Sequence, residues 1–385
     1  MDDFIRKVLQ VAMLVMVTTS LVVGLEWEPV LIVGGGRGDE DGELYEPVDV
    51  TVDVNGSIYV LERYNERIQK FDVNGVFKEI YGEAGSSGPG EFDGPGGIAI
   101  REVNATITQL FIADTDNHRI QVMTNELRTT EDNDTILNTT WQAFGERCYG
   151  DCVSWVYIYF EEPGGVDVDD SGRIYVADTG NNRISIIYDL PANLSKYPTP
   201  HNRTDLNGFN EPKAVSVRDD RIYVADTGNN QVKILNLTGS EINSIDGLNK
   251  PSSIALDSVG NIYVADSLNS RIMIFNPQGL YLTEFGEENC SVHIYNDPEA
   301  AVGQFCMPEG IEIRGEKIYV ADTGNHRIQV FETRELPLPT CPLAGDYDPC
   351  GEVILEEVVD YMVLWGQGQA EVGDVVALIN AWAWG

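Results

Sequence analysis

The chain has 385 residues, 43% of them hydrophobic, and a formal net charge of −37 at pH 7. This hydrophobic content is sufficient for a folded core, whereas such an acidic surface repels phosphate backbones and argues against nucleic acid as a partner. The charge favours solubility and interaction with divalent cations or basic partners.

Residues 1–24 have the pattern of a secretory signal peptide. Arg6 and Lys7 precede an apolar run from Val8 to Val23, and Val22-Val23-Gly24 is a plausible small-residue cleavage site. The alternative is an uncleaved N-terminal anchor, which would attach the chain to a membrane. Either alternative predicts an extracellular or cell-surface location.

The next segment contains Glu28-Pro29-Val30-Leu31-Ile32-Val33, a predicted strand followed by a Gly-rich loop. The last of the repeats described below lacks an obvious fourth strand. We therefore expect this N-terminal strand to complete that repeat and close a ring, which removes two exposed sheet edges. The alternative is donation of the strand to a neighbouring molecule, giving self-assembly.

A repeated motif dominates residues 30–331. Residues 174–184 read Ile-Tyr-Val-Ala-Asp-Thr-Gly-Asn-Asn-Arg-Ile, and further copies begin at Ile58, Phe111, Ile222, Ile262 and Ile318. A proline opens each of the six copies: Pro47, Pro95, Pro163, Pro212, Pro251 and Pro308. Alternating β-branched and aromatic residues between Gly, Asn and Asp turns predict antiparallel strands, up to four in each copy.

The pattern Pro-x-Gly-Ile, Ile-Tyr-Val-Ala-Asp and Asn-x-Arg-Ile resembles the NHL-repeat family of β-propellers. The resemblance implies an all-β, six-bladed propeller over residues 25–332. The first copy departs from the motif with Leu61-Glu62 in place of Ala-Asp, and the fourth has Gln231 in place of Arg. Lyases and lactonases of similar fold hold a metal at the central mouth, but the four His residues of this chain form no recognisable set.

Two polar positions recur in every copy. One is an acidic column, and the other is an Asn column three residues later: Glu62, Asp114, Asp178, Asp226, Asp266 and Asp322, with Asn65, Asn117, Asn181, Asn229, Asn269 and Asn325. A catalytic site needs unlike groups at one place, whereas a repeated residue solves a repeated backbone problem. We therefore predict turn capping and pairing with the recurring Arg. His118 and His326 share a position held elsewhere by Asn or Ser, which predicts a variable surface position.

Six cysteines fall into three local pairs, which in a secreted chain predicts three disulfides. The predicted pairs are Cys148 with Cys152, Cys290 with Cys306, and Cys341 with Cys350. Eight Asn-x-Ser/Thr sequences predict glycosylation at Asn55, Asn104, Asn133, Asn138, Asn193, Asn202, Asn236 and Asn289.

Aromatic residues gather in the longest connection between repeats, residues 125–162, whose first half is polar. Trp155, Tyr157 and Tyr159 there, with His293 and Tyr295 in the loop of residues 286–307, form the predicted binding face for a protein or glycan. The alternative is a self-packed loop held by Cys148 and Cys152. Residues 189–211 are predicted to be a surface excursion.

Residues 333–340 read as a Pro-rich linker, and residues 341–385 change character. Two apolar runs at helical spacing, 353–365 and 372–382, align with each other and predict a pair of α-helices. The segment partly resembles a dockerin module, which implies docking to a cohesin-like protein. Asp346, Asp348 and Glu357 match ligand positions for one weakly bound calcium ion. The alternative is a helical hairpin that packs on the propeller or lies on a membrane.

These features predict a secreted or cell-surface scaffold that binds protein or glycan and is docked by its C-terminal module. One alternative is an extracellular metal-dependent lyase or lactonase. Another is a structural subunit of an envelope or filament.

Overall fold

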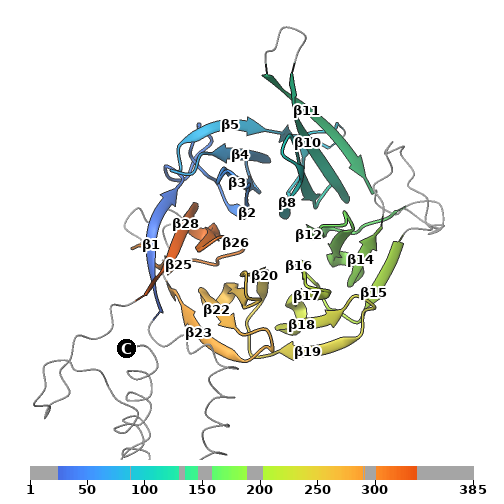
Figure 1. Cartoon of the computed structure of the whole chain (residues 1–385), viewed down its shortest axis with the longest axis vertical. Helices are drawn as coiled ribbons and strands as arrows, with labels where there is room; N and C mark the ends of the chain where they lie inside the picture. Colours follow the sequence, from blue (N-terminus) through green and yellow to red (C-terminus); the bar gives the residue numbers. More distant parts are fainter. Residues whose placement is uncertain are drawn as a thin grey trace, which may run out of the picture. The chain divides into compact units, whose positions relative to one another are not determined.

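The computed structural model describes residues 25–86, 88–129, 135–145, 158–188, 203–288, 290 and 301–335. These residues form six four-stranded antiparallel sheets arranged as blades around a central axis (Figure 1). The described secondary structure is β-strand with single turns of 3-10 helix, so the predicted all-β propeller of six blades is confirmed. None of the described residues belongs to a helix long and apolar enough to cross a membrane.

Each blade runs from an inner strand at the axis to an outer strand at the rim. Blade 1 contains β2 (Pro47–Val52), β3 (Ile58–Glu62), β4 (Arg67–Phe71) and β5 (Phe77–Tyr81). Blade 2 contains β8 (Gly97–Asn104), β9 (Ile107–Asp114), β10 (Arg119–Thr129) and β11 (Thr135–Phe144). Blade 3 contains β12 (Pro163–Val168), β13 (Ile174–Asp178), β14 (Arg183–Ile187) and β15 (Arg203–Asn207).

The second half of the ring repeats this order. Blade 4 contains β16 (Ala214–Arg218), β17 (Arg221–Asp226), β18 (Gln231–Asn236) and β19 (Glu241–Ile245). Blade 5 contains β20 (Pro251–Leu256), β21 (Ile262–Asp266), β22 (Arg271–Phe275) and β23 (Tyr281–Phe285). Blade 6 contains β26 (Ile311–Arg314), β27 (Lys317–Asp322), β28 (Arg327–Glu335) and the N-terminal β1 (Leu25–Val33).

Closure of the ring follows the prediction, because β1 hydrogen-bonds to β28 of the same chain. Trp27 of β1 stacks on Phe285 with ring centroids 5.2 Å apart and meets Tyr263 edge-on at 6.0 Å. The N-terminal strand is thus packed against blade 5 as well as paired within blade 6.

The hydrophobic core is divided into six clusters, each lying between two adjacent blades. The motif Ile-Tyr-Val-Ala-Asp forms the second strand of a blade, and all five of its residues are buried in blades 3 and 5. A strand covered on both faces needs a continuous apolar run. Inner strands approach closely at the axis: a Cβ added to Gly97 would lie 2.9 Å from the Cα of Gly165.

Two segments differ from the sequence prediction. The first half of residues 125–162 was predicted to be a polar connection, but β10 extends to Thr129 and pairs with β11 from Thr135 as a hairpin that projects from the ring (Figure 1). The predicted excursion of residues 189–211 contains β15, the outer strand of blade 3. Polar residues can occupy these strands because outer strands lie at the solvent-exposed rim.

Other predictions fall on segments outside the described residues. These are the signal segment, the predicted linker beyond Glu335 and the helical pair of residues 341–385.

Candidate binding site at the channel mouth

The acidic column organises the loops on one face of the ring, which we call the mouth face. Each column carboxylate is fully buried and accepts a backbone N–H from the residue two positions before the opening proline of its own blade, at 2.6 to 2.9 Å. It also accepts the side-chain amide of the Asn three residues later. Five of the six carboxylates pair with Arg Nε at 2.6 to 2.8 Å. In blade 4 the Gln231 side-chain amide donates to the carboxylate instead. The predicted structural role is therefore confirmed.

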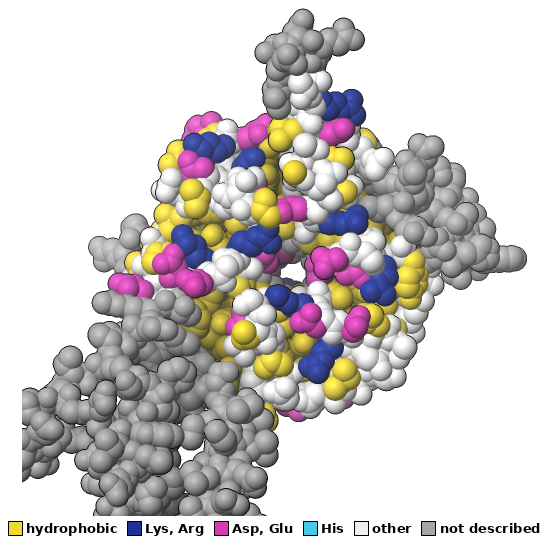
Figure 2. Space-filling view, viewed as in Figure 1, with side chains coloured by type: hydrophobic (Ala, Val, Ile, Leu, Met, Phe, Trp, Pro, Cys, Tyr) yellow, Lys and Arg dark blue, Asp and Glu magenta, His cyan; other side chains and the backbone are white. Residues whose placement is uncertain are grey.

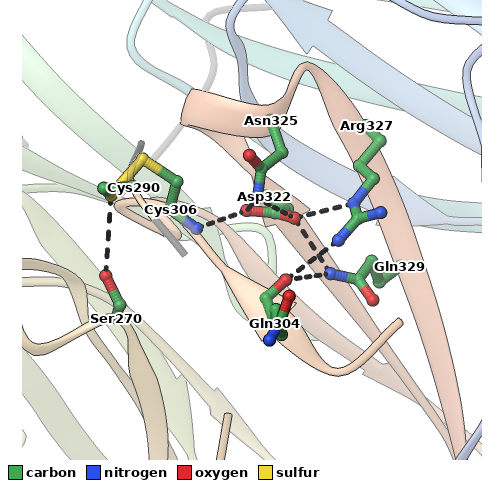
Figure 3. The surroundings of a disulfide bond; sticks show 8 residues. All are labelled: Ser270, Cys290, Gln304, Cys306, Asp322, Asn325, Arg327 and Gln329. Carbon is green, nitrogen blue, oxygen red and sulfur yellow. Dashed lines mark hydrogen bonds and ion pairs between the residues drawn. A yellow bond between two sulfur atoms is a disulfide. The ribbon is translucent and has the colours of Figure 1, made fainter. Parts of the chain in front are cut away.

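Figure 3 shows this network in blade 6. The Asp322 carboxylate accepts hydrogen bonds from the Cys306 backbone N–H, the Asn325 amide, Arg327 Nε and Gln329 Nε2. Cys306 is bonded to Cys290, which confirms one of the three predicted disulfides. The other two pairs lie outside the described residues.

A second set of bonds joins each blade to the next. The residue after the column donates its hydroxyl to the carbonyl of the next blade's opening proline, at 2.6 to 2.8 Å, in five blades: Thr115, Thr179, Thr227, Ser267 and Thr323. Blade 1 has Arg63 at this position. Its guanidinium donates to the Glu309 carboxylate and not to a proline carbonyl, so this blade breaks the pattern.

Arg63 lies at the mouth of the channel. Its two terminal nitrogens donate to the Glu309 carboxylate of blade 6 at 3.2 and 2.7 Å, and Glu46 lies 3.7 Å away. Lys213 of blade 4 lies 3.9 Å from the same Glu309. Burial would raise the pKa of Glu309, but the Arg63 charge and its hydrogen bonds, with Lys213, hold that pKa below its ordinary value.

The residues flanking each opening proline form two rings around the mouth. The pre-proline ring consists of Glu46, Gly94, Glu162, Glu211, Lys250 and Met307, all with positive φ between 47° and 53°. The post-proline ring consists of Val48, Gly96, Gly164, Lys213, Ser252 and Glu309. In blades 1, 3 and 5 a β-bulge follows the proline, a feature that re-aims side chains.

A cavity of about 240 Å³ opens at this mouth and is lined by the whole post-proline ring together with Arg63. A neighbouring hollow of about 580 Å³ reaches across blades 3 to 6 and is lined by Glu162, Glu211, Lys250, Met307 and Leu268. Leu268 is 52% exposed. The mouth therefore combines fixed charges of both signs with an apolar rim. Figure 2 shows charged side chains of both signs around the central opening on one face of the ring.

The pre-proline ring is held in place across blade boundaries. The backbone N–H of Glu46 donates to His326 Nδ1 at 3.1 Å, and that of Glu162 donates to His118 Nδ1 at 3.0 Å. Asn182 and Asn230 accept the same bond from Glu211 and Lys250 at 2.7 and 2.9 Å. The prediction of a surface position was wrong for both histidines, which are 6% and 1% exposed, because the position must supply a buried acceptor.

Deeper in the channel, Asp49, Asp167 and Glu312 line a narrower cavity of about 170 Å³. Burial raises the pKa of both aspartates to about 7, although each also accepts backbone N–H bonds that lower it. Burial and then the charges of Asp167 and Asp49 raise the pKa of Glu312 to about 8. Among the described residues, no three His, Cys, Asp or Glu side chains are grouped to hold a metal ion.

Most of the predicted site residues fall outside the described residues: Trp155, Tyr157, His293, Tyr295, Asp346, Asp348 and Glu357. Tyr159 is described and partly buried, and its carbonyl accepts a bond from Arg183 at 2.8 Å. Sequence reasoning missed Arg63 and the two rings. The available signal was variation at positions flanking a repeated proline, and a single Arg where five copies have Thr or Ser.

The fold and this mouth define a β-propeller with a cavity at the mouth of its central channel. The NHL repeat model matches residues 44–71, 160–187, 209–235, 248–275 and 305–331, which are blades 1, 3, 4, 5 and 6. The protein is therefore an NHL-repeat β-propeller.

Similarity to characterised proteins is partial. The chain is 38% identical over 89 residues to peptidyl-glycine alpha-amidating monooxygenase B of Xenopus laevis, covering 22% of this chain and 10% of that protein. The rat peptidylglycine alpha-amidating monooxygenase is 35% identical over 88 residues, covering 22% and 8%. The chain thus spans about a tenth of the length of these relatives.

The fold also occurs in solved structures. A Bacteroides thetaiotaomicron protein of unknown function aligns with a TM-score of 0.55 at 13% identity, over 80% of this chain and 76% of that chain. Virginiamycin B lyase of Staphylococcus aureus aligns with a TM-score of 0.47 at 13% identity, over 80% and 99%. The first likeness supports the fold, and neither carries a function to this chain.

Proposed function

We propose that this protein is an extracellular or cell-surface binding propeller whose mouth face recognises a segment of a partner protein. The observation that carries the proposal is Arg63. The other five blades use this position to stabilise the ring, whereas blade 1 replaces a structural hydroxyl with a cation beside the mouth cavity. A residue that gives up a repeated structural bond is best explained by a role in recognition.

The chemistry of the mouth suits a protein segment that carries charges of both signs. Arg63, Lys213 and Lys250 provide cations, Glu162 and Glu211 provide anions, and Leu268 with Met307 adds apolar area. Charged groups held in defined positions give specificity, and apolar contacts at the rim add affinity. A glycan remains the alternative ligand.

The substitution Arg63→Thr tests this proposal, because it restores the residue found in four of the other blades. We expect the variant to fold and to gain an inter-blade hydrogen bond to the Pro95 carbonyl, which offsets part of the stability lost with the Arg63–Glu309 pair between blades 1 and 6. Loss of a charged contact at the centre of an interface should weaken binding at least tenfold. The measurement is binding of the purified protein to immobilised peptides of mixed charge and, in parallel, to a glycan array.

Thr323→Val is the matched control. It removes the 2.8 Å bond to the Pro47 carbonyl, so stability should fall by about 1 kcal/mol while the side chains that line the mouth stay. Peptide binding that is unchanged in Arg63→Thr would contradict the proposal. Binding of glycans alone, lost in the same variant, would move the ligand from protein to carbohydrate.

The C-terminal segment has a part in this proposal. A dockerin-like module at residues 341–385, with one calcium ion at Asp346, Asp348 and Glu357, would dock the propeller to a cohesin-like or envelope protein. Its support is the sequence pattern. A structural subunit of an envelope or filament is the alternative use of such docking.

A second candidate function is enzymatic. It is favoured by the local identity to peptidyl-glycine alpha-amidating monooxygenases, and the sequence alternative was a metal-dependent lyase or lactonase. An enzyme would act at the same mouth, where propellers commonly place their sites. Turnover of peptide or lactone substrates by the purified chain, measured with and without added divalent metal, distinguishes it from a binding protein.

A further inference from the structure

The two faces of the ring differ in their glycosylation sequences. Because strands alternate in direction, the connections between strands 1 and 2 and between strands 3 and 4 of every blade emerge on the face opposite the mouth. Asn55 lies between β2 and β3, Asn104 at the end of β8, and Asn236 at the end of β18. All three of these described sequons therefore lie on the opposite face.

The local geometry at two of these sites presents the amide nitrogen to solvent. Asn104 Oδ1 accepts the Thr106 N–H at 2.8 Å, the Thr106 hydroxyl at 2.9 Å and the Ile107 N–H at 3.0 Å. Asn236 Oδ1 accepts the Thr238 N–H at 3.0 Å, the Thr238 hydroxyl at 2.7 Å and the Ser240 N–H at 2.9 Å. Within the described residues, neither Nδ2 donates to the protein.

The sequon hydroxyl thus contacts the asparagine that would be modified. The Oδ1 atom of that asparagine is occupied by hydrogen bonds, while its Nδ2 atom, where the glycan would be attached, is accessible. Asn104 is exposed and Asn236 is half-exposed. Asn276 forms the same turn, with its Oδ1 accepting the Gln278 and Leu280 N–H groups at 3.0 and 2.9 Å. It is followed by Pro277 and Gln278, so this third turn lacks the sequon.

We propose that Asn104 and Asn236, with Asn55, carry N-linked glycans, and that these glycans cover the face opposite the mouth. Transfer joins Nδ2 to the anomeric carbon of a lipid-linked oligosaccharide and breaks the bond from that carbon to the lipid phosphate. One Nδ2 proton is released with the lipid phosphate, and no oxidant or reductant is involved. Glycans are bulky and solubilising, so the covered face is closed to protein partners.

The consequence for recognition rests on the proposed function: a partner can approach only from the mouth face. A further sequon, Asn289, follows β24 (Glu287–Glu288) in the sequence and lies outside the described residues. Asn138 lies within β11 near the projecting end of blade 2.

Glycopeptide mass spectrometry of the full-length protein from its native source tests the proposal. We expect glycan masses on peptides containing Asn55, Asn104 and Asn236, and an unmodified peptide for Asn276. Asn236→Asp is the matched variant, because Asp72 and Asp257 show that aspartate accepts the same turn bonds. It should lose one glycan and keep the thermal midpoint of the unglycosylated chain.

Unmodified Asn104 and Asn236 in the native protein would overturn the proposal. The arrangement on one face is tested separately, by comparing peptide binding before and after enzymatic removal of the glycans. Affinity should change by less than about threefold, since the mouth is distant from the sugars, and a larger change would contradict it. Because glycan mass is measured without a partner, failure here leaves mouth binding intact, and loss of binding in Arg63→Thr leaves the glycans intact.

Discussion

At the scale of single residues, the ring is built from bonds that recur and from a few side chains that do not. Three groups each make the same hydrogen bond in several blades. They are the column carboxylate, the hydroxyl of the next residue, and the Asn or His side chain that accepts a backbone N–H from the following blade. A chemical group repeated around an axis cannot by itself make an asymmetric site. Residues that break the repetition, such as Arg63 and Lys213, are therefore the ones to test for function.

His326 makes one blade boundary sensitive to acid. It must be neutral at Nδ1 to accept the Glu46 N–H, and burial, with the nearby Arg37 charge, lowers its pKa from 6.5 to about 4. A group with a depressed folded pKa of this kind binds a proton more readily when unfolded. Stability is then complete above about pH 6.5 and declines as the pH falls toward 4.

His326→Asn should remove this decline, because Asn182 and Asn230 make the same bond in other blades. Linkage gives an advantage of about 2 kcal/mol for the variant at pH 5 and little difference at pH 8. Urea unfolding at both pH values measures it. Parallel stability profiles for the two proteins would show that His326 does not titrate with folding.

Glu312 gives the opposite pH dependence. Its folded pKa of about 8 lies above its ordinary 4.5, so the stability linked to its protonated form is present at low pH and is lost as the pH rises through 8. Glu312→Gln should therefore stabilise the ring by about 1–3 kcal/mol at pH 8 and have no effect at pH 4. Glu316→Gln, an exposed neighbour, is the control and should be neutral at both. Equal effects of the two substitutions would contradict the raised pKa of Glu312 in the channel.

At the scale of elements, closure depends on β1, the one strand supplied from the other end of the chain. Its anchor is Trp27, which contacts Phe285 and Tyr263 of the adjacent blade. Trp27→Ala should lower the free energy of unfolding by about 3 kcal/mol through loss of buried aromatic area. Val30→Ala, on the same strand but 44% exposed, should cost less than about 0.5 kcal/mol.

Chemical denaturation of both variants measures these costs, and size-exclusion chromatography of Trp27→Ala checks for strand exchange. If the tryptophan variant were monomeric and as stable as Val30→Ala, β1 would not close the ring as described. A concentration-dependent dimer would instead support exchange of the strand between molecules.

The elements were predictable where the sequence repeats. Period-two runs between turns marked the strands, and the opening prolines marked the blades, because both patterns reflect local backbone geometry. The hairpin ending at Thr129 and the strand Arg203–Asn207 were missed, since solvent-exposed outer strands need no apolar pattern. The mouth rings were missed because a left-handed residue before proline changes where its side chain points, and no sequence pattern states that direction.

At the scale of the whole molecule, opposite faces serve different purposes in a ring of antiparallel blades. The loops that open each blade gather the variable charged residues at the mouth, and the hairpins on the other face carry the Asx turns with their sequons. A net charge of −37 adds long-range repulsion between copies, which opposes aggregation and favours basic partners. The described propeller needs no contribution from residues 341–385 to close its ring.

The C-terminal segment should therefore respond to calcium independently of the propeller. If Asp346, Asp348 and Glu357 bind the ion, calcium at about 100 times its Kd should stabilise that segment by about 2.7 kcal/mol. Calorimetry of the full chain should show one transition that shifts with calcium and is reversed by a chelator. A chain ending at Pro339, and the variant Asp348→Asn, should show no shift.

A calcium response in the shortened chain would place the ion on the propeller, and no response in the full chain would remove the support for a dockerin-like module. Partner capture with and without residues 341–385 then separates docking by the tail from recognition at the mouth.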